Sequence, residues 1–130
     1  MQDHLRRAVE EEERAVALYP TFGPIRYSLA RLLDEDGRPM EALEQYREAL
    51  RLGELVEREP WSTDRMKVPP LARARCHVRL GERAKALALL TAAPPPTPEE
   101  LASEWDDLMR PVIEESRKAI ITPGSSKDGK

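Results

Sequence analysis

The chain has 130 residues and a formal net charge of −3, and 35% of its residues are charged, 40% hydrophobic and 5% aromatic. This length suits one domain with a modest core, the scarcity of aromatic residues disfavours a sheet, and the small net charge indicates no class of partner. The single cysteine, Cys76, excludes an internal disulfide and favours a reducing compartment.

The first predicted element is a helix over residues 2–18, because apolar side chains recur there at helical spacing. Its expected apolar side consists of Leu5, Ala8, Val9, Ala15, Val16 and Leu18. The charge run from Glu10 to Glu13 should lie on the side that faces water. This start of the chain has no continuous apolar segment, so it does not resemble a signal peptide. A turn is expected at residues 20–24.

The next two predicted helices form the centre of the chain, over residues 27–50. Gly37 supplies the backbone freedom that ends the first of them, and Pro39 begins the second at a position where a missing N–H costs nothing. Ala30 and Ala42 are small enough to let the two backbones approach to about 8–10 Å. We therefore predict a tight antiparallel helix hairpin.

The chain beyond this hairpin predicts a second pair of helices. The second helix of the central hairpin should continue until Pro60 stops it. Residues 61–70 form a connection, and its prolines lead into a helix over about residues 71–80. A further helix is predicted over about residues 82–92.

The last predicted helix follows a stiff spacer of three prolines, Pro94 to Pro96. Thr97 should cap this helix at its start. Pro111 removes one intrahelical hydrogen bond, so a kink or break is expected near Leu108. The tail over residues 121–130 is polar and rich in Gly and Ser, and we expect it to be disordered.

The central hairpin carries a set of residues at a characteristic spacing: Leu29, Ala30, Leu33, Gly37, Glu41, Ala42, Tyr46 and Ala49. In this order and spacing they resemble the tetratricopeptide (TPR) repeat, a helix-turn-helix motif with a period of about 34 residues. Ala8 and Ala15 match two of its alanines one period earlier. Gly81, Ala86 and Leu90 take the places of its glycine, an alanine and its tyrosine 44 residues later, so about ten residues have been added between those two units.

The resemblance implies an all-α fold, a TPR-like stack of antiparallel helix hairpins with about six helices and a C-terminal capping helix. A single domain would then cover residues 1–120. Its parts would be the second helix of a partial repeat at 1–20, a central repeat at 22–58, a degenerate repeat at 68–93 and a capping helix at 97–120.

No arrangement of reactive side chains in the sequence indicates catalysis. The two histidines, His4 and His77, lie on different predicted helices, and no Cys/His/Asp cluster has metal-ligand spacing. Cys76 adjoins His77, but neighbours in a helix point about 100° apart and do not form a nucleophile–base pair. The acidic pair Asp106-Asp107 is interpreted as a solvated face. We therefore predict no enzyme activity, no metal site and no cofactor.

Basic residues dominate the run from Arg65 to Lys85, where acidic residues are nearly absent. In the TPR family, the first helix of each repeat lines a concave surface. By that resemblance the surface here comprises Tyr27, Arg31, Asp34, Glu35, Leu71, Arg75 and Arg79. Its arginines would receive an acidic peptide or a terminal carboxylate through charge-assisted hydrogen bonds, and a solvated face without a ligand is the alternative. The inward Lys and Asn of the carboxylate-clamp adaptors of chaperones are not reproduced, so we do not assign chaperone-tail binding.

The expected function is a non-catalytic protein–protein interaction module or scaffold that binds a peptide or protein segment on a concave helical surface. Two alternatives stay open: a nucleic-acid-binding helical repeat that uses residues 65–85, and a regulatory or scaffold fragment of a larger enzyme. Nucleic acid is disfavoured by the acidic overall balance and by the few aromatic residues.

The first predicted helix lacks the partner helix of a complete repeat. Its apolar side would therefore have an exposed edge, which a homodimer could cover. No apolar run in the sequence is long enough to span a membrane, and we expect a cytoplasmic location.

Overall fold

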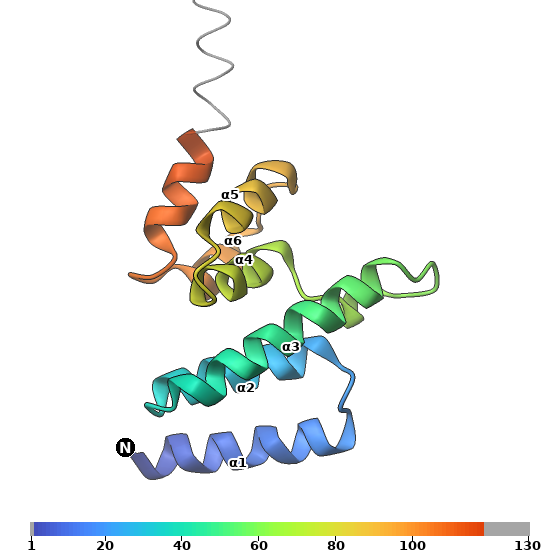
Figure 1. Ribbon diagram of the computed structural model, residues 1–130, viewed down its shortest axis with the longest axis vertical. Helices are drawn as coiled ribbons and strands as arrows, with labels where there is room; N and C mark the ends of the chain where they lie inside the picture. Colours follow the sequence, from blue (N-terminus) through green and yellow to red (C-terminus); the bar gives the residue numbers. More distant parts are fainter. Residues whose placement is uncertain (1, 119–130) are drawn as a thin grey trace, which may run out of the picture. The chain divides into compact units, whose positions relative to one another are not determined.

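The computed structural model describes residues 2–118, and all regular structure in this range is helical (Figure 1). The helices are α1 (Gln2–Leu18), α2 (Gly23–Glu35), α3 (Pro39–Glu57), the 3-10 helix η1 (Asp64–Met66), α4 (Pro70–Arg79), α5 (Arg83–Ala92) and α6 (Pro98–Glu104). A further helical segment occupies residues 110–118. No strand occurs among the described residues, so the predicted all-α class is confirmed.

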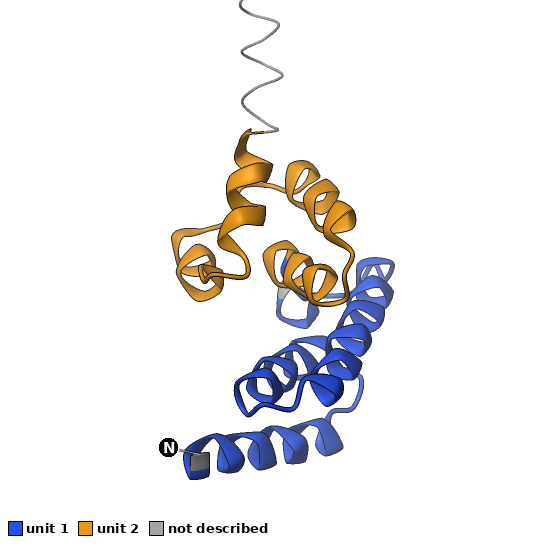
Figure 2. Cartoon of the chain, turned by 60° about the vertical axis from the view of Figure 1, so that its left-hand side comes forward, with its two compact units in different colours: residues 1–69 blue, residues 70–130 orange. Residues whose placement is uncertain are grey.

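The chain divides into two compact units, residues 1–69 and residues 70–130, denoted unit 1 and unit 2 (Figure 2). Unit 1 contains α1, α2, α3 and η1, and unit 2 contains α4, α5, α6 and the segment 110–118. The sequence predicted one domain over residues 1–120 and did not indicate this division.

Unit 1 consists of helices packed as neighbours, α1 on α2 and α2 on α3 (Figure 1). The hairpin of α2 and α3 provides most of its core. The buried residues of these three helices include Val9, Leu29, Leu33, Tyr46 and Ala49. Ala30 and Ala42 are both fully buried, as a closely packed helix pair requires.

The start of α2 differs from the prediction. The sequence predicts a turn through residues 20–24, but α2 begins at Gly23 and includes Pro24 in its first turn. Proline is tolerated there, because the first N–H groups of a helix have no intrahelical acceptor. Gly23 is also tightly packed, since a Cβ on it would lie 2.9 Å from Val68 Cγ2. The connection after α3 therefore returns onto the start of α2.

The turns of the two hairpins, α2–α3 and α4–α5, have the same backbone geometry at an offset of 44 residues. Gly37 and Gly81 adopt positive φ angles of 74° and 79°, and each follows the end of its helix as the sequence predicted. The same hydrogen bond closes both turns: Arg38 N–H to the Leu33 carbonyl at 2.9 Å, and Glu82 N–H to the His77 carbonyl at 2.7 Å. This pairing of a residue with the carbonyl five positions earlier satisfies a carbonyl at the helix end.

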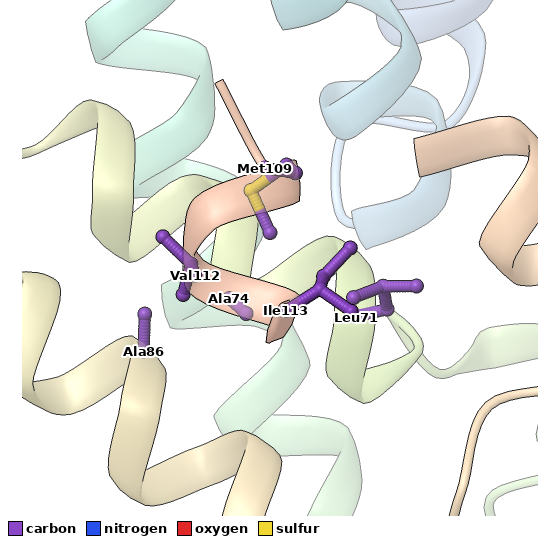
Figure 3. Close-up of a cluster of buried hydrophobic side chains, with 6 residues drawn as sticks. All are labelled: Leu71, Ala74, Ala86, Met109, Val112 and Ile113. Carbon is purple, nitrogen blue, oxygen red and sulfur yellow. The ribbon is translucent and has the colours of Figure 1, made fainter. Parts of the chain in front are cut away.

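The core of unit 2 joins the α4–α5 hairpin to residues 109–113 (Figure 3). It contains Leu71, Ala74, Ala86, Met109, Val112 and Ile113. Its two alanines, Ala74 and Ala86, are fully buried and lie 44 residues after Ala30 and Ala42. Both hairpins therefore have a pair of buried small residues in equivalent places.

The predicted capping helix over residues 97–120 is two helical segments in the structure. The first, α6, has only seven residues, and a capping box begins it as the sequence predicted. Thr97 Oγ1 accepts the Glu100 N–H at 3.1 Å, and Glu100 Oε1 accepts the Thr97 N–H at 2.7 Å. The chain then leaves helical geometry, and Asp106 Oδ1 accepts the Met109 N–H at 3.0 Å at the start of the next helical segment.

The predicted break near Leu108 therefore exists, but it covers residues 105–109. Pro111 does not kink a helix. It lies in the first turn of the segment 110–118, where its missing N–H is tolerated. The tail predicted to be disordered, residues 121–130, lies outside the described residues.

Candidate functional site

The four predicted site residues of unit 1 lie on α2, and two of them contact Tyr46 of α3. The ring of Tyr27 packs edge-on against the ring of Tyr46, with centroids 6.0 Å apart and planes at 63°. The Tyr46 side chain is 1% exposed, and its hydroxyl donates to Asp34 Oδ2 at 2.9 Å. Arg31 is half-buried and Glu35 is exposed. Tyr27 and Asp34 therefore stabilise the hairpin, whether or not this face binds a ligand.

The three predicted site residues of unit 2 lie on α4, and two of them are buried. Leu71 is 2% exposed and belongs to the core. Arg75 is 4% exposed, and two acidic side chains bind its guanidinium. Its Nε donates to Glu104 Oε1 at 2.7 Å, and its Nη2 donates to the Asp106 carboxylate. Arg79 is half-buried.

Arg75, Glu104 and Asp106, denoted the Arg75 cluster, connect α4 to the end of α6. Glu104 is itself 5% exposed, and burial of its charge is tolerated because an opposite charge and a hydrogen bond compensate it. Because Arg75 is 4% exposed and already binds two carboxylates, a ligand carboxylate would reach its guanidinium only after this cluster rearranged. Asp106 thus has a structural role that the sequence did not indicate. Ligand binding by the seven predicted site residues stays a prediction.

Acidic residues of unit 2 partly balance the basic run of residues 65–85. Arg83 forms an ion pair with Glu115, and Lys85 forms one with Glu82 at 3.4 Å. These pairs reduce the local positive charge on which nucleic-acid binding through this run would depend. Nucleic acid stays a disfavoured alternative.

Cys76 and His77 are adjacent in α4 but have separate environments. Cys76 is fully buried, and burial, reinforced by the nearby charge of Glu104, raises the pKa of its thiol to about 12. Such a thiol is protonated and unreactive at neutral pH. Nδ1 of His77 lies 2.9 Å from Glu82 Oε1, and this hydrogen bond lowers the pKa of the Glu82 carboxyl. His77 is therefore part of the α4–α5 turn.

The outward side of α1 is charged rather than apolar. Its exposed residues include Arg6, Arg7, Glu10, Glu11, Glu13 and Arg14. Val9 is fully buried, and Leu5, Ala8 and Val16 are half-buried. Within α1 as described, Leu18, 74% exposed, is the large apolar side chain that faces water. Leu18 and the half-buried side chains therefore provide the apolar surface that this helix exposes, and the homodimer stays a prediction.

Unit 2 contains an apolar groove of about 660 Å³ that the sequence did not indicate. It lies between the start of α4, the end of α5 with the segment that follows it, α6, and the helical segment 110–118. Its walls include Leu71, Leu90, Leu101 and Ile113 and the three consecutive prolines Pro94, Pro95 and Pro96. A mainly apolar lining and a volume within about 300–1,000 Å³ are usual for ligand pockets.

Few polar groups line this groove. Ser116 is buried, and its hydroxyl donates to the Ile113 carbonyl at 2.7 Å. Glu100 is engaged in the capping box of α6. The guanidinium of Arg117 lies 5.9 Å from the centroid of the Trp105 ring, which is the geometry of a cation–π contact. Arg117 is therefore the lining charge that is not paired with a carboxylate of the described residues.

The groove lies where the second hairpin has smaller side chains than the first. Leu71 and Leu90 occupy the places of Tyr27 and Tyr46, 44 residues later. The two tyrosines pack against each other, whereas both leucines line the groove. α5 is also shorter than α3, with 10 residues against 19. No motif marks such a site. The alignment of the two hairpins did show Leu90 in the place of Tyr46, but the exchange of a tyrosine for a leucine does not by itself indicate a groove.

Comparisons with known proteins assign no family to this arrangement. No family model matches the chain, and no curated protein or solved structure matches it either. Within residues 2–118, no helix is long and apolar enough to cross a bilayer, and no group of three or more His, Cys, Asp or Glu side chains could hold a metal ion. The TPR resemblance therefore remains an expectation from the sequence.

Proposed function

We propose that the chain is a non-catalytic binding module that holds a peptide or protein segment in the groove of unit 2. The observation that carries this proposal is the groove itself, whose volume of about 660 Å³ is far larger than the voids of a packed core. Apolar surface left in contact with water costs free energy and commonly marks a binding site. A peptide that covers Leu90 and Leu101 with aliphatic side chains would regain that free energy.

We propose further that the module is a TPR-like repeat protein. This is supported by the correspondence of the two hairpins at an offset of 44 residues, in their glycine turns and in their buried alanine pairs. The residues in excess of the usual period of about 34 would lie in the long α3 and in the connection that follows it. Arg31, Glu35 and Arg79 would then contribute to the wider docking surface of such a repeat.

The nucleic-acid alternative has less support. It depends on the basic run of residues 65–85, and Arg75, Arg83 and Lys85 in that run contact carboxylates of the chain. A scaffold fragment of a larger enzyme would use the same groove, and it would differ from the proposal only in chemistry outside these residues.

The proposal is tested with a displayed library of random dodecapeptides selected against the folded chain. The affinities of selected peptides are then measured by fluorescence polarisation for wild type, Leu90→Trp and Leu18→Trp. Leu90→Trp fills the groove, whereas Leu18 is exposed on α1 and provides a matched control. We expect Leu90→Trp to weaken binding by about tenfold or more and Leu18→Trp to leave it unchanged.

Circular dichroism of each variant shows whether the helices are intact. Peptides that bind folded Leu90→Trp as tightly as wild type would exclude the groove as the site. A selection that enriches no binding peptide would remove the proposed function altogether.

A further inference from the structure

We infer that the occupant of the groove is an extended, aliphatic peptide that pairs its backbone N–H groups with the carbonyls of residues 90–96 and places an acidic side chain at Arg117. This inference rests on the proposed function and specifies the chemistry of the ligand. It depends on three features of the groove: backbone carbonyls without donors within residues 2–118, aliphatic walls and one positive charge.

The end of α5 leaves backbone carbonyls without donors. In a continuing helix, the N–H groups of residues 94–96 would donate to the carbonyls of residues 90–92. All three of those donors are missing, because residues 94–96 are prolines. The nearest remaining N–H groups, those of Ala93 and Thr97, have other acceptors. Among residues 2–118, no hydrogen bond reaches the carbonyls of residues 90–96.

The part of this segment that follows α5, residues 93–97, is extended. Ala93 has φ −80° and ψ 157°, Thr97 has φ −71° and ψ 160°, and the prolines between them have φ fixed near about −65°. A backbone in this geometry makes no internal hydrogen bonds. Leu90, Thr91, Ala93 and the three prolines line the groove, so we place the peptide backbone along this segment, where the prolines offer carbonyl acceptors and no N–H donor.

The other walls of the groove are aliphatic. Leu101 of α6 and Ile113 of the segment 110–118 face the space that Leu71 and Leu90 also line. No aromatic residue belongs to the described lining, so the groove has no flat platform for a ring. Branched aliphatic side chains such as those of Leu, Ile and Val would fill this volume and remove the walls from water.

Arg117 gives the groove a positive charge. The other charged lining residue, Glu100, is already bound to the Thr97 N–H. The contact of Arg117 with the ring of Trp105 orients its guanidinium without neutralising it. A carboxylate on the ligand would therefore find charge-assisted hydrogen bonds at this wall.

A fatty acid satisfies two of these three features, since it has an aliphatic chain and a carboxylate. It has no N–H group, however, and would leave the carbonyls of residues 90–96 without donors where it covers them. Covering a polar group without replacing its hydrogen bond costs free energy. These carbonyls therefore favour a peptide over a lipid.

The test uses the groove-binding peptides in matched synthetic forms. One form replaces the acidic side chain by its amide, and another replaces a single backbone amide by an ester, which removes one N–H. With wild type, we expect the neutral form to bind about tenfold more weakly and at least one ester form to bind about three- to tenfold more weakly.

Two charge variants locate the acidic side chain. In Arg117→Gln the acidic and neutral peptides should bind equally, because the cation that distinguishes them is gone. Lys118→Gln removes the adjoining exposed cation, which does not line the groove, and should preserve the difference.

The inference is overturned if every ester form binds as well as its amide parent, or if Arg117→Gln and Lys118→Gln behave alike. It is also overturned if dodecanoate displaces the peptides at equal affinity, which would assign the groove to a lipid-like ligand. The Leu90→Trp result separates these outcomes from failure of the proposed function, since it reports groove binding whatever the ligand chemistry. A selection without any groove-binding peptide removes both proposals.

Discussion

The hairpins α2–α3 and α4–α5 show how one turn geometry supports two different surfaces. Both are closed by a glycine with positive φ, and both bury a pair of alanines. They differ in the side chains beside that pair. The first hairpin has Tyr27 packed against Tyr46, whereas the second has Leu71 and Leu90 in these places, and both leucines line the groove. The buried alanines let the helices of both hairpins pack closely, whereas the larger side chains beside them differ, and the groove is found at the hairpin with leucines.

The two hairpins also differ in how they hold charge. Arg31 of α2 and Arg75 of α4 occupy equivalent places at the offset of 44 residues. Arg31 is half-buried, whereas Arg75 is nearly inaccessible and bound to Glu104 and Asp106. Unit 2 thus uses a buried ion pair to connect its hairpin to the next helix.

Breaking the Arg75 cluster should have the largest effect on stability. Arg75→Met leaves the Glu104 carboxylate buried without its partner, and removing one member of a buried ion pair costs about 3–5 kcal/mol. Urea unfolding followed by circular dichroism measures the loss. Arg51→Met is the control, because Arg51 and Glu48 form an exposed pair and no resolvable change is expected.

Hydrogen exchange resolved by peptide should place this loss in residues 70–118. Equal unfolding midpoints for Arg75→Met and wild type would contradict a stabilising role for the cluster. Recovery of stability when Glu104→Leu is added to Arg75→Met would support it, since the unpaired charge is then gone.

Tyr46→Leu gives the first hairpin the residue that the second hairpin has at the equivalent position, Leu90. The variant loses the ring contact with Tyr27 and the hydrogen bond to Asp34, and we expect a loss of about 2–4 kcal/mol in the free energy of unfolding. Leu90→Tyr is the reciprocal change, and it should be tolerated because the added ring enters an existing groove. Equal losses for the two variants would mean that the hairpins do not differ in packing as described.

Substitution of the buried alanines tests whether the two helices are equally close together in both hairpins. Ala42→Leu and Ala86→Leu should each destabilise by about 1–3 kcal/mol through overpacking, whereas Ala17→Leu, on the exposed side of α1, should be nearly neutral. Thermal unfolding of the three variants measures this. If Ala42→Leu lowers the stability and Ala86→Leu does not, the helices of the second hairpin are less closely packed at their alanine pair.

Low pH should slightly reduce the stability of both the α2–α3 and the α4–α5 turn. This is the smallest effect that we predict. Hydrogen bonds from Arg38 to Glu41 and between His77 and Glu82 lower the pKa of both carboxyls below their ordinary value of 4.5. Because the pKa is lower in the folded chain, the stabilisation is present above pH 4.5 and is lost as the pH falls through the folded-state pKa.

The urea midpoint should therefore decline below that pH in wild type. The decline should be shallower when Glu41→Gln and Glu82→Gln are combined. If the urea midpoint declines equally with falling pH in wild type and in the double variant, other carboxyls cause the acid sensitivity.

Signals within a few residues of one another predicted much of this fold. Apolar spacing indicated the helices, Gly37 and Gly81 indicated the turns, and Thr97 indicated the start of α6, all of which the structure confirms. The break in the last predicted helix was also expected, but from Pro111. In the structure the break covers residues 105–109, and Asp106 accepts the Met109 N–H just before the next helical segment, so the break starts earlier than Pro111 indicated.

Features that depend on distant residues were not predictable in this way. Arg75 meets Glu104 across 29 residues, and that contact requires α6 to end where it does. The groove has no motif, because residues from four separate parts of unit 2 line it: 70–71, 90–96, 100–101 and 113–117. The division into two units likewise depends on the distribution of contacts along the whole chain.

The single thiol gives unit 2 an intrinsic chemical reporter. Cys76 is the one cysteine of the chain, fully buried and protonated at neutral pH, so a thiol reagent can modify it only when α4 transiently opens. The labelling rate of the unaltered protein therefore measures that opening without an added probe. A peptide that binds the closed groove should slow the labelling in proportion to its occupancy, so the chain can report its own ligands.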